Sequence, residues 1–314
     1  MRIVFCGTPE FAVPTLQALL ADPEFAVEAV VTQPDRPRGR GQQVSASPVK
    51  EVALAARARI YQPERVKTDE AHDFFAAIKP DAAVIIAYGQ IIPGRLLEIP
   101  RLGWMNLHAS LLPKYRGAAP IAWAIINGES ETGLTTMRLD PGLDTGPILM
   151  QREIEIGGDE TAPELAKRMA EMGAPLVMES LAKLDRGEIV PVPQDASQAS
   201  YAPILTKEHG RIDWGQTAGE LHNRIRGLAP WPGAFTTFRG RLCHIWGKPV
   251  AGARYVASAP EPGSVIFSGG AIEIVCGRGT RLQLEAVQVE GRKRISAREF
   301  VNGARLASGE RLGV

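Results

Sequence analysis

Two polar side chains two positions apart, Asn106 and His108, end an apolar run at residues 105–108 that is typical of a buried strand. On a strand, residues i and i+2 point to the same side, so this spacing brings an amide and an imidazole to one face. In an open α/β sheet, ligands bind at the carboxyl ends of the strands. The pair alone fits a structural histidine and a catalytic one equally well.

A glycine-rich acidic segment, residues 140–147, follows the next apolar run at residues 133–139. Such a loop can hold the Asp144 carboxylate against the imidazole of a neighbouring strand. A carboxylate placed there orients the ring and raises its pKa, so that it is charged when needed. The segment by itself is most simply a turn, but together with Asn106 and His108 it predicts a catalytic trio.

The elements that must position this trio alternate along the first half of the chain. Apolar runs predict strands at residues 2–6, 27–32, 82–87, 105–108 and 133–139. Amphipathic stretches predict helices at residues 9–20, 49–58 and 68–78, and a long helix at 161–186. Strands that are apolar throughout are expected where helices cover both faces of a parallel sheet. The pattern predicts a doubly wound, mostly parallel, Rossmann-like sheet.

The second half has a different pattern. Residues 188–206 are polar and contain three prolines, which suits an extended linker. A predicted helix at 217–228 then precedes short strands at 234–239, 242–248, 263–267, 271–276 and 281–289. This spacing predicts a small antiparallel, OB-like β-barrel. We therefore expect a catalytic domain at 1–187, a linker at 188–206 and a barrel domain at 207–314.

Charge is distributed unevenly, although the net charge is only +1. From Lys207 onward there are 16 Lys/Arg and 9 Asp/Glu, a balance of +7, which leaves 20 against 26, or −6, for the rest. A basic half fits either a polyanionic partner or a solvated, arginine-rich surface. The three cysteines are far apart and offer neither a disulfide framework nor a metal site, which favours the cytoplasm. No apolar run reaches the ~18 residues of a membrane span.

A decapeptide that begins at His108 resembles the signature of the 10-formyltetrahydrofolate-dependent formyltransferases: His108-Ala109-Ser110-Leu111-Leu112-Pro113-Lys114-Tyr115-Arg116-Gly117. Asn106 before it and Leu143-Asp144-Thr145-Gly146 after it complete the resemblance. The similarity covers nearly the whole chain. Similarity to the methionyl-tRNA branch in particular is seen at residues 4–12, 32–37, 38–41, 47–50, 212–214 and 223–234. Gln42 and Gln43 depart from it, since relatives often carry lysines there.

The resemblance implies transfer of a formyl group from 10-formyltetrahydrofolate, as co-substrate, to the amine of methionyl-initiator tRNA, for translation initiation. Asn106 and a protonated His108 would stabilise the oxyanion of the tetrahedral intermediate, and Asp144 would hold the imidazole. The substrate amine is the nucleophile, so neither a nucleophilic side chain nor a metal is expected. We expect a monomer.

Binding residues also follow from the resemblance. The folate is expected against Ser110, Leu111, Leu112 and Pro113, and in an apolar slot that includes Ile86, Tyr88, Gln90 and Ile91. The polar segment 34–50 carries Arg36, Arg38, Arg40 and Lys50, and we expect this segment, without regular structure, to contact the tRNA acceptor end. Lys207, Arg224 and Arg226 are expected to track the tRNA backbone.

Four alternatives were weighed against this interpretation. Formyltransferases that act on amino-sugar nucleotides share the catalytic motif, but the arginine-rich segment 34–50 and the basic second half favour tRNA. Glycinamide ribonucleotide formyltransferases resemble only about the first two-thirds of the chain. A tRNA-binding protein without catalysis is disfavoured because Asn106, His108 and Asp144 are intact. A nucleotide-dependent dehydrogenase is excluded by the missing glycine fingerprint after the first strand.

Overall fold

The computed structural model describes residues 1–38, 43–252 and 260–313, so the predicted tRNA contact Arg40 lies outside the described residues. The chain divides into two compact units. Unit 1 comprises residues 1–120, 131–155 and 165–203, and unit 2 comprises residues 121–130, 156–164 and 204–314. Two segments of the first half, 121–130 and 156–164, therefore belong to the same unit as the C-terminal part of the chain.

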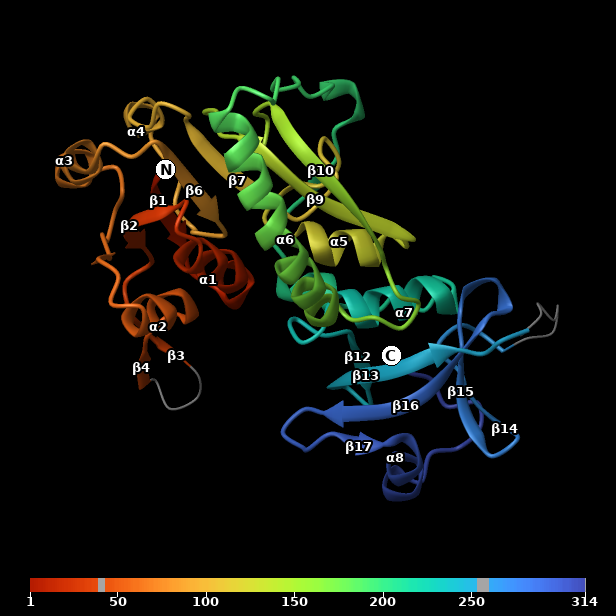
Figure 1. Ribbon diagram of the computed structural model, residues 1–314. Helices are drawn as coiled ribbons and strands as arrows, with labels where there is room; N and C mark the ends of the chain where they lie inside the picture. The colour runs from red at the N-terminus through yellow and green to blue at the C-terminus, as the bar shows by residue number, and fades with distance from the viewer. Residues whose placement is uncertain (39–42, 253–259, 314) are drawn as a thin grey trace. The chain divides into compact units, whose positions relative to one another are not determined.

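Unit 1 is built on a seven-stranded sheet in the order β10-β9-β7-β6-β1-β2-β5 (Figure 1). Strands β1, β2, β5, β6 and β7 are parallel, whereas β9 runs antiparallel to β7 and β10 runs antiparallel to β9. This confirms the predicted mostly parallel, Rossmann-like sheet. Strands β5 and β10 were not predicted: β5 has only two residues, and β10 contains Gln151, Arg152, Glu153 and Glu155 and so lacks a continuous apolar run. The strands are β1 (Arg2–Gly7), β2 (Ala26–Val31), β5 (Ile60–Tyr61), β6 (Ala82–Ile86), β7 (Trp104–His108), β9 (Glu131–Arg138) and β10 (Ile148–Glu155).

Helices cover both faces of this sheet, with α3 and α4 on one face and α1 and α6 on the other (Figure 1). Local sequence sets their starts: the Thr68 hydroxyl accepts a hydrogen bond from the Ala71 amide at the start of α3. Ser47 caps α2 in the same way, and Pro48 follows it at the first helical position. The helices are α1 (Val13–Ala21), α2 (Pro48–Ala55), α3 (Asp69–Ile78), α4 (Gly94–Leu97) and α6 (Ala162–Asp185). The four longer ones were predicted to within a few residues.

The core beneath α3 and α4 joins side chains of the parallel strands to aromatic residues. Phe75 and Trp104 are fully or almost fully buried there, with ring centroids 5.3 Å apart. Cys6 lies in the same cluster, and burial raises the pKa of its thiol. Cys243 and Cys276 are buried in unit 2, where desolvation raises the pKa of their thiols to about 11 and about 12. None of these three cysteines is therefore a reactive thiolate near neutral pH.

The segment 34–50 is more regular than predicted. Strands β3 (Arg36–Arg38) and β4 (Gln43–Ser45) pair antiparallel, so the expectation of a segment without regular structure was wrong. β-Branched Val44 and the extended backbone that Pro37 favours suit a short hairpin. Residues 39–42, between the two strands, lie outside the described residues.

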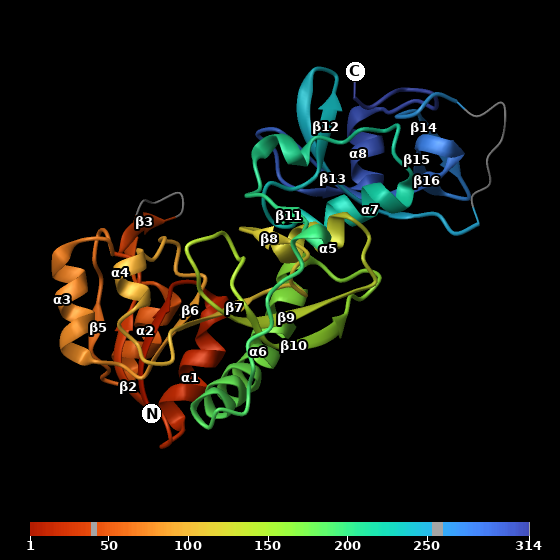
Figure 2. The same cartoon turned by 90° about the horizontal axis from the view of Figure 1, so that it is seen from above.

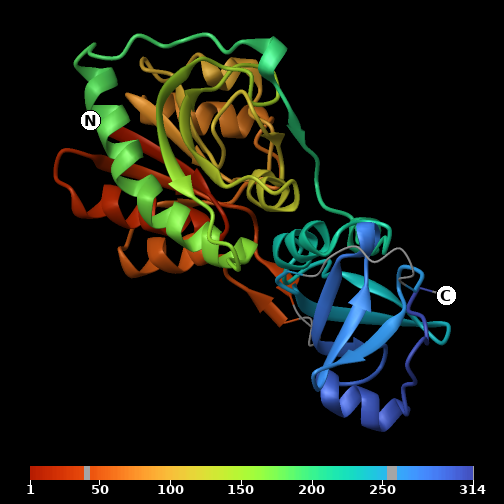
Figure 3. The ribbon, with the colours of Figure 1, turned by 90° about the vertical axis from the view of Figure 1, so that its right-hand side faces the viewer.

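Residues 188–206 were expected to form an extended linker, but most of this stretch belongs to unit 1. After α6 the chain runs back along this unit (Figure 3). Val192 forms a β-bridge with Ile148, and β11 (Tyr201–Ala202) pairs in parallel with β8 (Arg116–Gly117). This return path brings residues from beyond α6 next to the segment that follows His108.

Unit 2 contains a six-stranded antiparallel sheet in the order β12-β13-β16-β15-β14 (Figure 2), with β17 paired to β16 (Figure 1). This confirms the predicted antiparallel β domain. Helix α7 packs against β13, and a buried cluster that includes Trp214, Ile274 and Phe300 forms the core. The elements are β12 (Phe235–Phe238), β13 (Arg241–Pro249), β14 (Val265–Ser268), β15 (Ala271–Val275), β16 (Arg281–Val289), β17 (Ile295–Ser296), α7 (Ala218–Gly227) and α8 (Ala297–Ala304), with most of α5 (Pro120–Ile126) in the same unit. None of the helices in the described ranges has both the length and the apolar character that crossing a membrane requires.

Candidate active site

Strand β7 carries the polar side chains of Asn106 and His108. Leu107, between them, faces α6, where Gly173 permits close approach: an added Cβ at Gly173 would lie 2.5 Å from Leu107 Cδ2. Asn106 and His108 therefore project from the opposite face of the strand, as their spacing predicts. Asn106 is half-buried, and among the described residues its side-chain amide has no hydrogen-bond partner. This amide is therefore available to bind a ligand.

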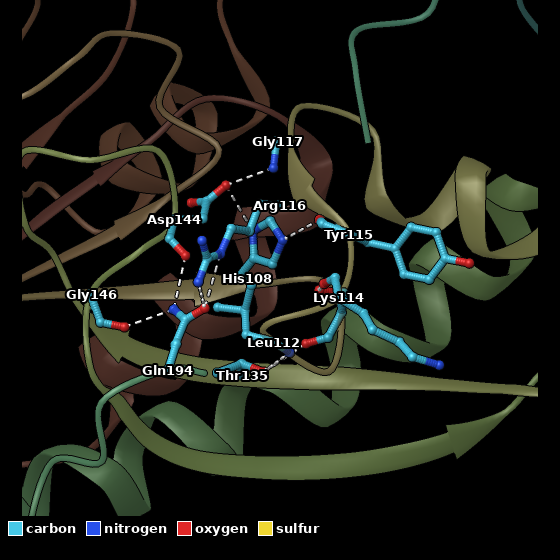
Figure 4. A network of polar contacts seen from close by, with 11 residues as sticks. His108, Leu112, Lys114, Tyr115, Arg116, Gly117, Thr135, Asp144, Gly146 and Gln194 are labelled. Atoms are coloured by element: carbon cyan, nitrogen blue, oxygen red, sulfur yellow. Dashed lines mark hydrogen bonds and ion pairs between the residues drawn. The ribbon is translucent and has the colours of Figure 1, made fainter. Parts of the chain in front are cut away.

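His108 is buried and has contacts at both ring nitrogens (Figure 4). Its Nε2 lies 2.9 Å from the Tyr115 carbonyl oxygen. A carbonyl can only accept, so Nε2 carries a proton and donates it. Nδ1 lies 3.6 Å from Asp144 Oδ2, beyond direct hydrogen-bond distance. Nδ1 is therefore the ring nitrogen left to face a substrate atom, with the Asp144 carboxylate beside it.

Asp144 reaches His108 by an indirect path. Because β9 runs antiparallel to β7, its last residue, Arg138, pairs with Met105 near the start of β7 and not with His108. The following loop must fold back along the strand. The Asp140 carboxylate accepts hydrogen bonds from the Thr145 hydroxyl and the Gly142 amide, which tightens the turn.

Three contacts fix the part of this loop that carries Asp144 (Figure 4). The Gly117 amide donates to Asp144 Oδ2 at 2.8 Å, and Gln194 Nε2 donates to the carbonyl oxygens of Asp144 and Gly146 at 2.8 and 2.7 Å. The buried Arg116 in turn donates to Gln194 Oε1 through Nε at 3.0 Å and Nη2 at 2.7 Å. The sequence analysis placed Arg116 in the signature decapeptide without a role, and it missed Gln194, since no local pattern distinguishes a glutamine in a polar, proline-containing stretch.

The predicted folate-binding segment after His108, residues 110–113, is held by a hydrogen bond to Lys114 and by hydrogen bonds with strands β9 and β10. The Ser110 hydroxyl donates to the Lys114 carbonyl at 2.6 Å. Thr135 on β9 receives a hydrogen bond from the Leu112 amide and donates one to the Ser110 carbonyl. Gln151 on β10 donates to the Leu112 carbonyl at 2.9 Å. This segment is thus rigid, with Leu111 and Pro113 half-buried at its surface.

In the second predicted folate-binding segment, residues 86–91, three of the four predicted side chains are buried or bonded to other parts of unit 1, so mainly the backbone is left to bind a ligand. Ile86 and Tyr88 are 0% and 1% exposed, and Tyr88 belongs to the core cluster beneath α3. Gln90 supports a neighbouring loop: its Oε1 accepts from the Val66 amide and its Nε2 donates to the Pro63 carbonyl. Ile91, by contrast, is 90% exposed and presents an apolar side chain at the surface.

Comparison with known proteins assigns the family. The family model "Formyl transferase" matches residues 1–181, and "Formyl transferase, C-terminal domain" matches residues 204–305. The "Methionyl-tRNA formyltransferase" of Solibacter usitatus is 55% identical over 314 residues, covering 100% of this chain and 99% of that protein. The chain is a member of the methionyl-tRNA formyltransferase family. The relative of the same name from Acidobacterium capsulatum is 51% identical over the full length of both chains.

More distant members of the fold are known as structures. WlaRD, a sugar 3N-formyl transferase solved with dTDP and 5-N-formyl-THF, has a TM-score of 0.67 at 20% identity and covers 93% of this chain and 99% of its own. HypX from Aquifex aeolicus, solved with tetrahydrofolic acid, has a TM-score of 0.59 at 19% identity, covering 96% of this chain and 48% of its own. At these identities the similarity shows the shared fold.

The residues predicted to bind tRNA differ in their exposure and in whether their charged groups already have partners within the protein. Lys207 and Arg36 are exposed, whereas Lys50 forms an ion pair with Asp35. The Arg224 guanidinium donates to the His209 carbonyl, and burial lowers its pKa. Arg226 is buried and donates to the Gly157 and Glu160 carbonyls and to Asn223 Oδ1. Arg224 and Arg226 therefore form contacts within unit 2, and the tRNA hypothesis rests on the other basic residues, of which Lys207 and Arg36 are exposed. The side chain of Arg38 lies outside the described residues.

Proposed function

We propose that this protein transfers the formyl group of 10-formyltetrahydrofolate to the free amino group of methionyl-initiator tRNA, with Asn106, His108 and Asp144 as its catalytic residues. The observation that carries the catalytic assignment is the Asn106 amide, without a partner among the described residues, on the same strand face as His108, whose Nδ1 lies 3.6 Å from Asp144 Oδ2. Full-length relatives at 51–55% identity bear the name of this activity.

The reaction needs stabilisation of one developing charge. The neutral amine attacks the formyl carbon, a C–N bond forms, and negative charge develops on the formyl oxygen. The Asn106 amide and the Nδ1 proton of His108 are two donors on one strand face that can meet this oxygen, and such donors act strongly in a water-poor site. The intermediate then collapses: the bond between the formyl carbon and the folate nitrogen breaks. The proton lost by the attacking nitrogen passes toward the folate nitrogen, with Asp144 as the nearest base to relay it.

The folate co-substrate is assigned by family and chemistry. Structures of two relatives contain 5-N-formyl-THF or tetrahydrofolic acid. A flat heterocycle binds best against an apolar wall with a few edge hydrogen bonds. We infer that the backbone of residues 86–91, together with residues 110–113, supplies that wall and those edges. A cytoplasmic location accords with three buried, unpaired thiols.

The function is tested by incubating the protein with 10-formyltetrahydrofolate and three acceptors: charged initiator methionyl-tRNA, charged elongator methionyl-tRNA and a nucleotide-linked amino sugar. We expect formylmethionyl-tRNA from the initiator, less from the elongator, and no formylated sugar. Formylation of the sugar without formylation of the tRNA would contradict the proposal.

One surface of unit 2 combines cations with aromatic rings. The Arg294 guanidinium stacks 4.0 Å from the Trp246 ring centroid, and Arg211 lies 5.7 Å from that of Phe235. His244 lies between the two rings, with centroids 5.8 Å from Phe235 and 6.4 Å from Trp246. Arg294 is exposed, and among the described residues no carboxylate pairs with it. A guanidinium held flat on a ring keeps its donor edge toward solvent, in a geometry that suits phosphate oxygens.

We therefore expect Arg294→Ala to weaken tRNA binding several-fold and to reduce the slope of log affinity against log salt concentration by about one. Arg298→Ala is the matched control, because Arg298 is an exposed arginine of the same unit without the stacked ring. Affinity is measured between about 50 and 200 mM salt by filter binding. Equal losses in both variants would mean that general charge, and not this surface, holds the tRNA. The folate KM should be the same in all three proteins.

A further inference from the structure

Gln194 connects the return segment of the chain to the loop that carries Asp144. It lies 50 residues beyond Asp144 in sequence, and its Nε2 donates to the Asp144 carbonyl at 2.8 Å and to the Gly146 carbonyl at 2.7 Å (Figure 4). Both hydrogens of one amide group thus bind the loop on either side of Thr145. The contacts among Asn106, His108 and Asp144 do not involve Gln194. By themselves they therefore give Gln194 no role in the reaction.

The loop needs such support because its catalytic residue has an unfavourable backbone conformation. Asp144 has a φ of 52°, in the left-handed region that non-glycine residues rarely adopt. Gly146 packs against Arg138 so closely that an added Cβ would lie 1.8 Å from the Arg138 carbonyl oxygen. Tying the carbonyls of Asp144 and Gly146 to one amide group fixes the orientation of both peptide planes, and with them the direction of the Asp144 side chain.

Gln194 is itself held in one orientation. The buried Arg116 donates to its Oε1 through Nε and Nη2 at 3.0 and 2.7 Å. Because Oε1 accepts from the guanidinium, the NH₂ group must face the loop. Arg116 directly precedes Gly117, whose amide donates to Asp144 Oδ2 at 2.8 Å. The carboxylate and the carbonyl of Asp144 are therefore both attached to the 116–117 backbone, the first directly and the second through Gln194.

We propose that Gln194 is a positioning residue for the catalytic reaction, which sets the distance and angle between the Asp144 carboxylate and His108 Nδ1. This inference rests on the proposed catalytic role of Asp144. It assigns residues 188–203 a part in the chemistry that goes beyond connecting the two units.

The test uses Gln194→Glu in the full-length protein. The carboxylate keeps the shape of the side chain and pairs with Arg116, so the thermal midpoint should be retained, but it cannot donate to either carbonyl. We expect kcat to fall ~10- to 100-fold, because displacing a catalytic group by about 1 Å lowers the rate on this scale. The KM values for folate and tRNA should change less than about twofold. Gln198→Glu is the matched control: Gln198 is an exposed glutamine of the same segment that donates only to Asp195, and its kcat should not change. Gln194→Met, which lacks both donors and the acceptor, should show the same loss of kcat as Gln194→Glu.

A double-mutant cycle separates this role from a general structural one. In an Asp144→Asn background, Gln194→Glu should lower kcat by less than about twofold, because its effect passes through Asp144. An undiminished effect in that background, or wild-type kcat in a folded Gln194→Glu protein, would overturn the inference. A different result, full activity of Asp144→Asn itself, would refute the catalytic assignment of Asp144 in the proposed function.

Discussion

Asn106→Ala is expected to lower kcat by ~10²–10³, the usual loss when one oxyanion donor is removed. Of the three catalytic candidates, Asn106 gives the cleanest test, because its amide has no hydrogen-bond partner among the described residues. His108 also donates to the Tyr115 carbonyl, and Asp144 also accepts from the Gly117 amide, so substitutions there disturb the backbone as well. Removing the Asn106 amide takes no hydrogen bond from any polar group in the described part of the chain.

Three measurements complete this prediction. The free energy of unfolding should change by less than about 1 kcal/mol, because a half-buried side chain without partners contributes little to stability. Binding of the non-transferable 5-formyl isomer of the folate should weaken less than about threefold, since the donor acts on the transition state. Asn106→Asp keeps the shape but places a carboxylate where negative charge develops, so its kcat should be at least as low. Near wild-type turnover in either variant would remove Asn106 from the mechanism.

Gly117→Ala is expected to lower both stability and turnover. Gly117 has a φ of 122°, which only glycine adopts without strain, and an added Cβ would lie 2.6 Å from the Ala202 carbonyl oxygen. To relieve this contact, β8 must move away from β11, and the Gly117 amide then moves from Asp144 Oδ2. We expect the free energy of unfolding to fall by about 2 kcal/mol or more and kcat by ~10²-fold.

Gly187→Ala is the matched control for this substitution. Gly187 also has a positive φ, of 70°, in the same unit, but nothing lies within 4 Å of an added Cβ. It should cost about 1 kcal/mol of backbone strain and leave kcat unchanged. Chemical denaturation and single-turnover kinetics distinguish the cases. If Gly117→Ala lost stability to the same small extent as the control and kept its kcat, the pairing of β8 with β11 would have no part in positioning Asp144.

Much of unit 1 is determined by sequence patterns that act over a few residues. Apolar runs predicted four of the five parallel strands, β1, β2, β6 and β7, and amphipathic stretches predicted helices α1, α2, α3 and α6. The two-residue period of a strand placed Asn106 and His108 on one face. The family resemblance of the segment 108–117 then identified the chemistry. These features were predictable because each depends on neighbours in the chain.

The basic residues show where sequence reasoning stops. Arg226 and Lys207 contribute equally to the charge of the second half, yet Arg226 is buried and donates to carbonyls of the segment 156–164, whereas Lys207 is exposed. Composition records charge but not burial. For the same reason the expected boundaries at 187 and 207 could not show that residues 121–130 and 156–164 form part of unit 2.

The proposed catalytic trio needed both levels of information. Sequence alone named Asp144, but the antiparallel direction of β9 starts its loop beside Met105, away from His108. Only the tertiary structure shows how the loop returns: Gly117 holds its carboxylate and Gln194, 50 residues later, holds its backbone. Periodicity and capping are encoded locally because each residue interacts with chain neighbours. A hydrogen bond across 50 residues depends on the whole path of the chain between its partners, and no short pattern specifies that path.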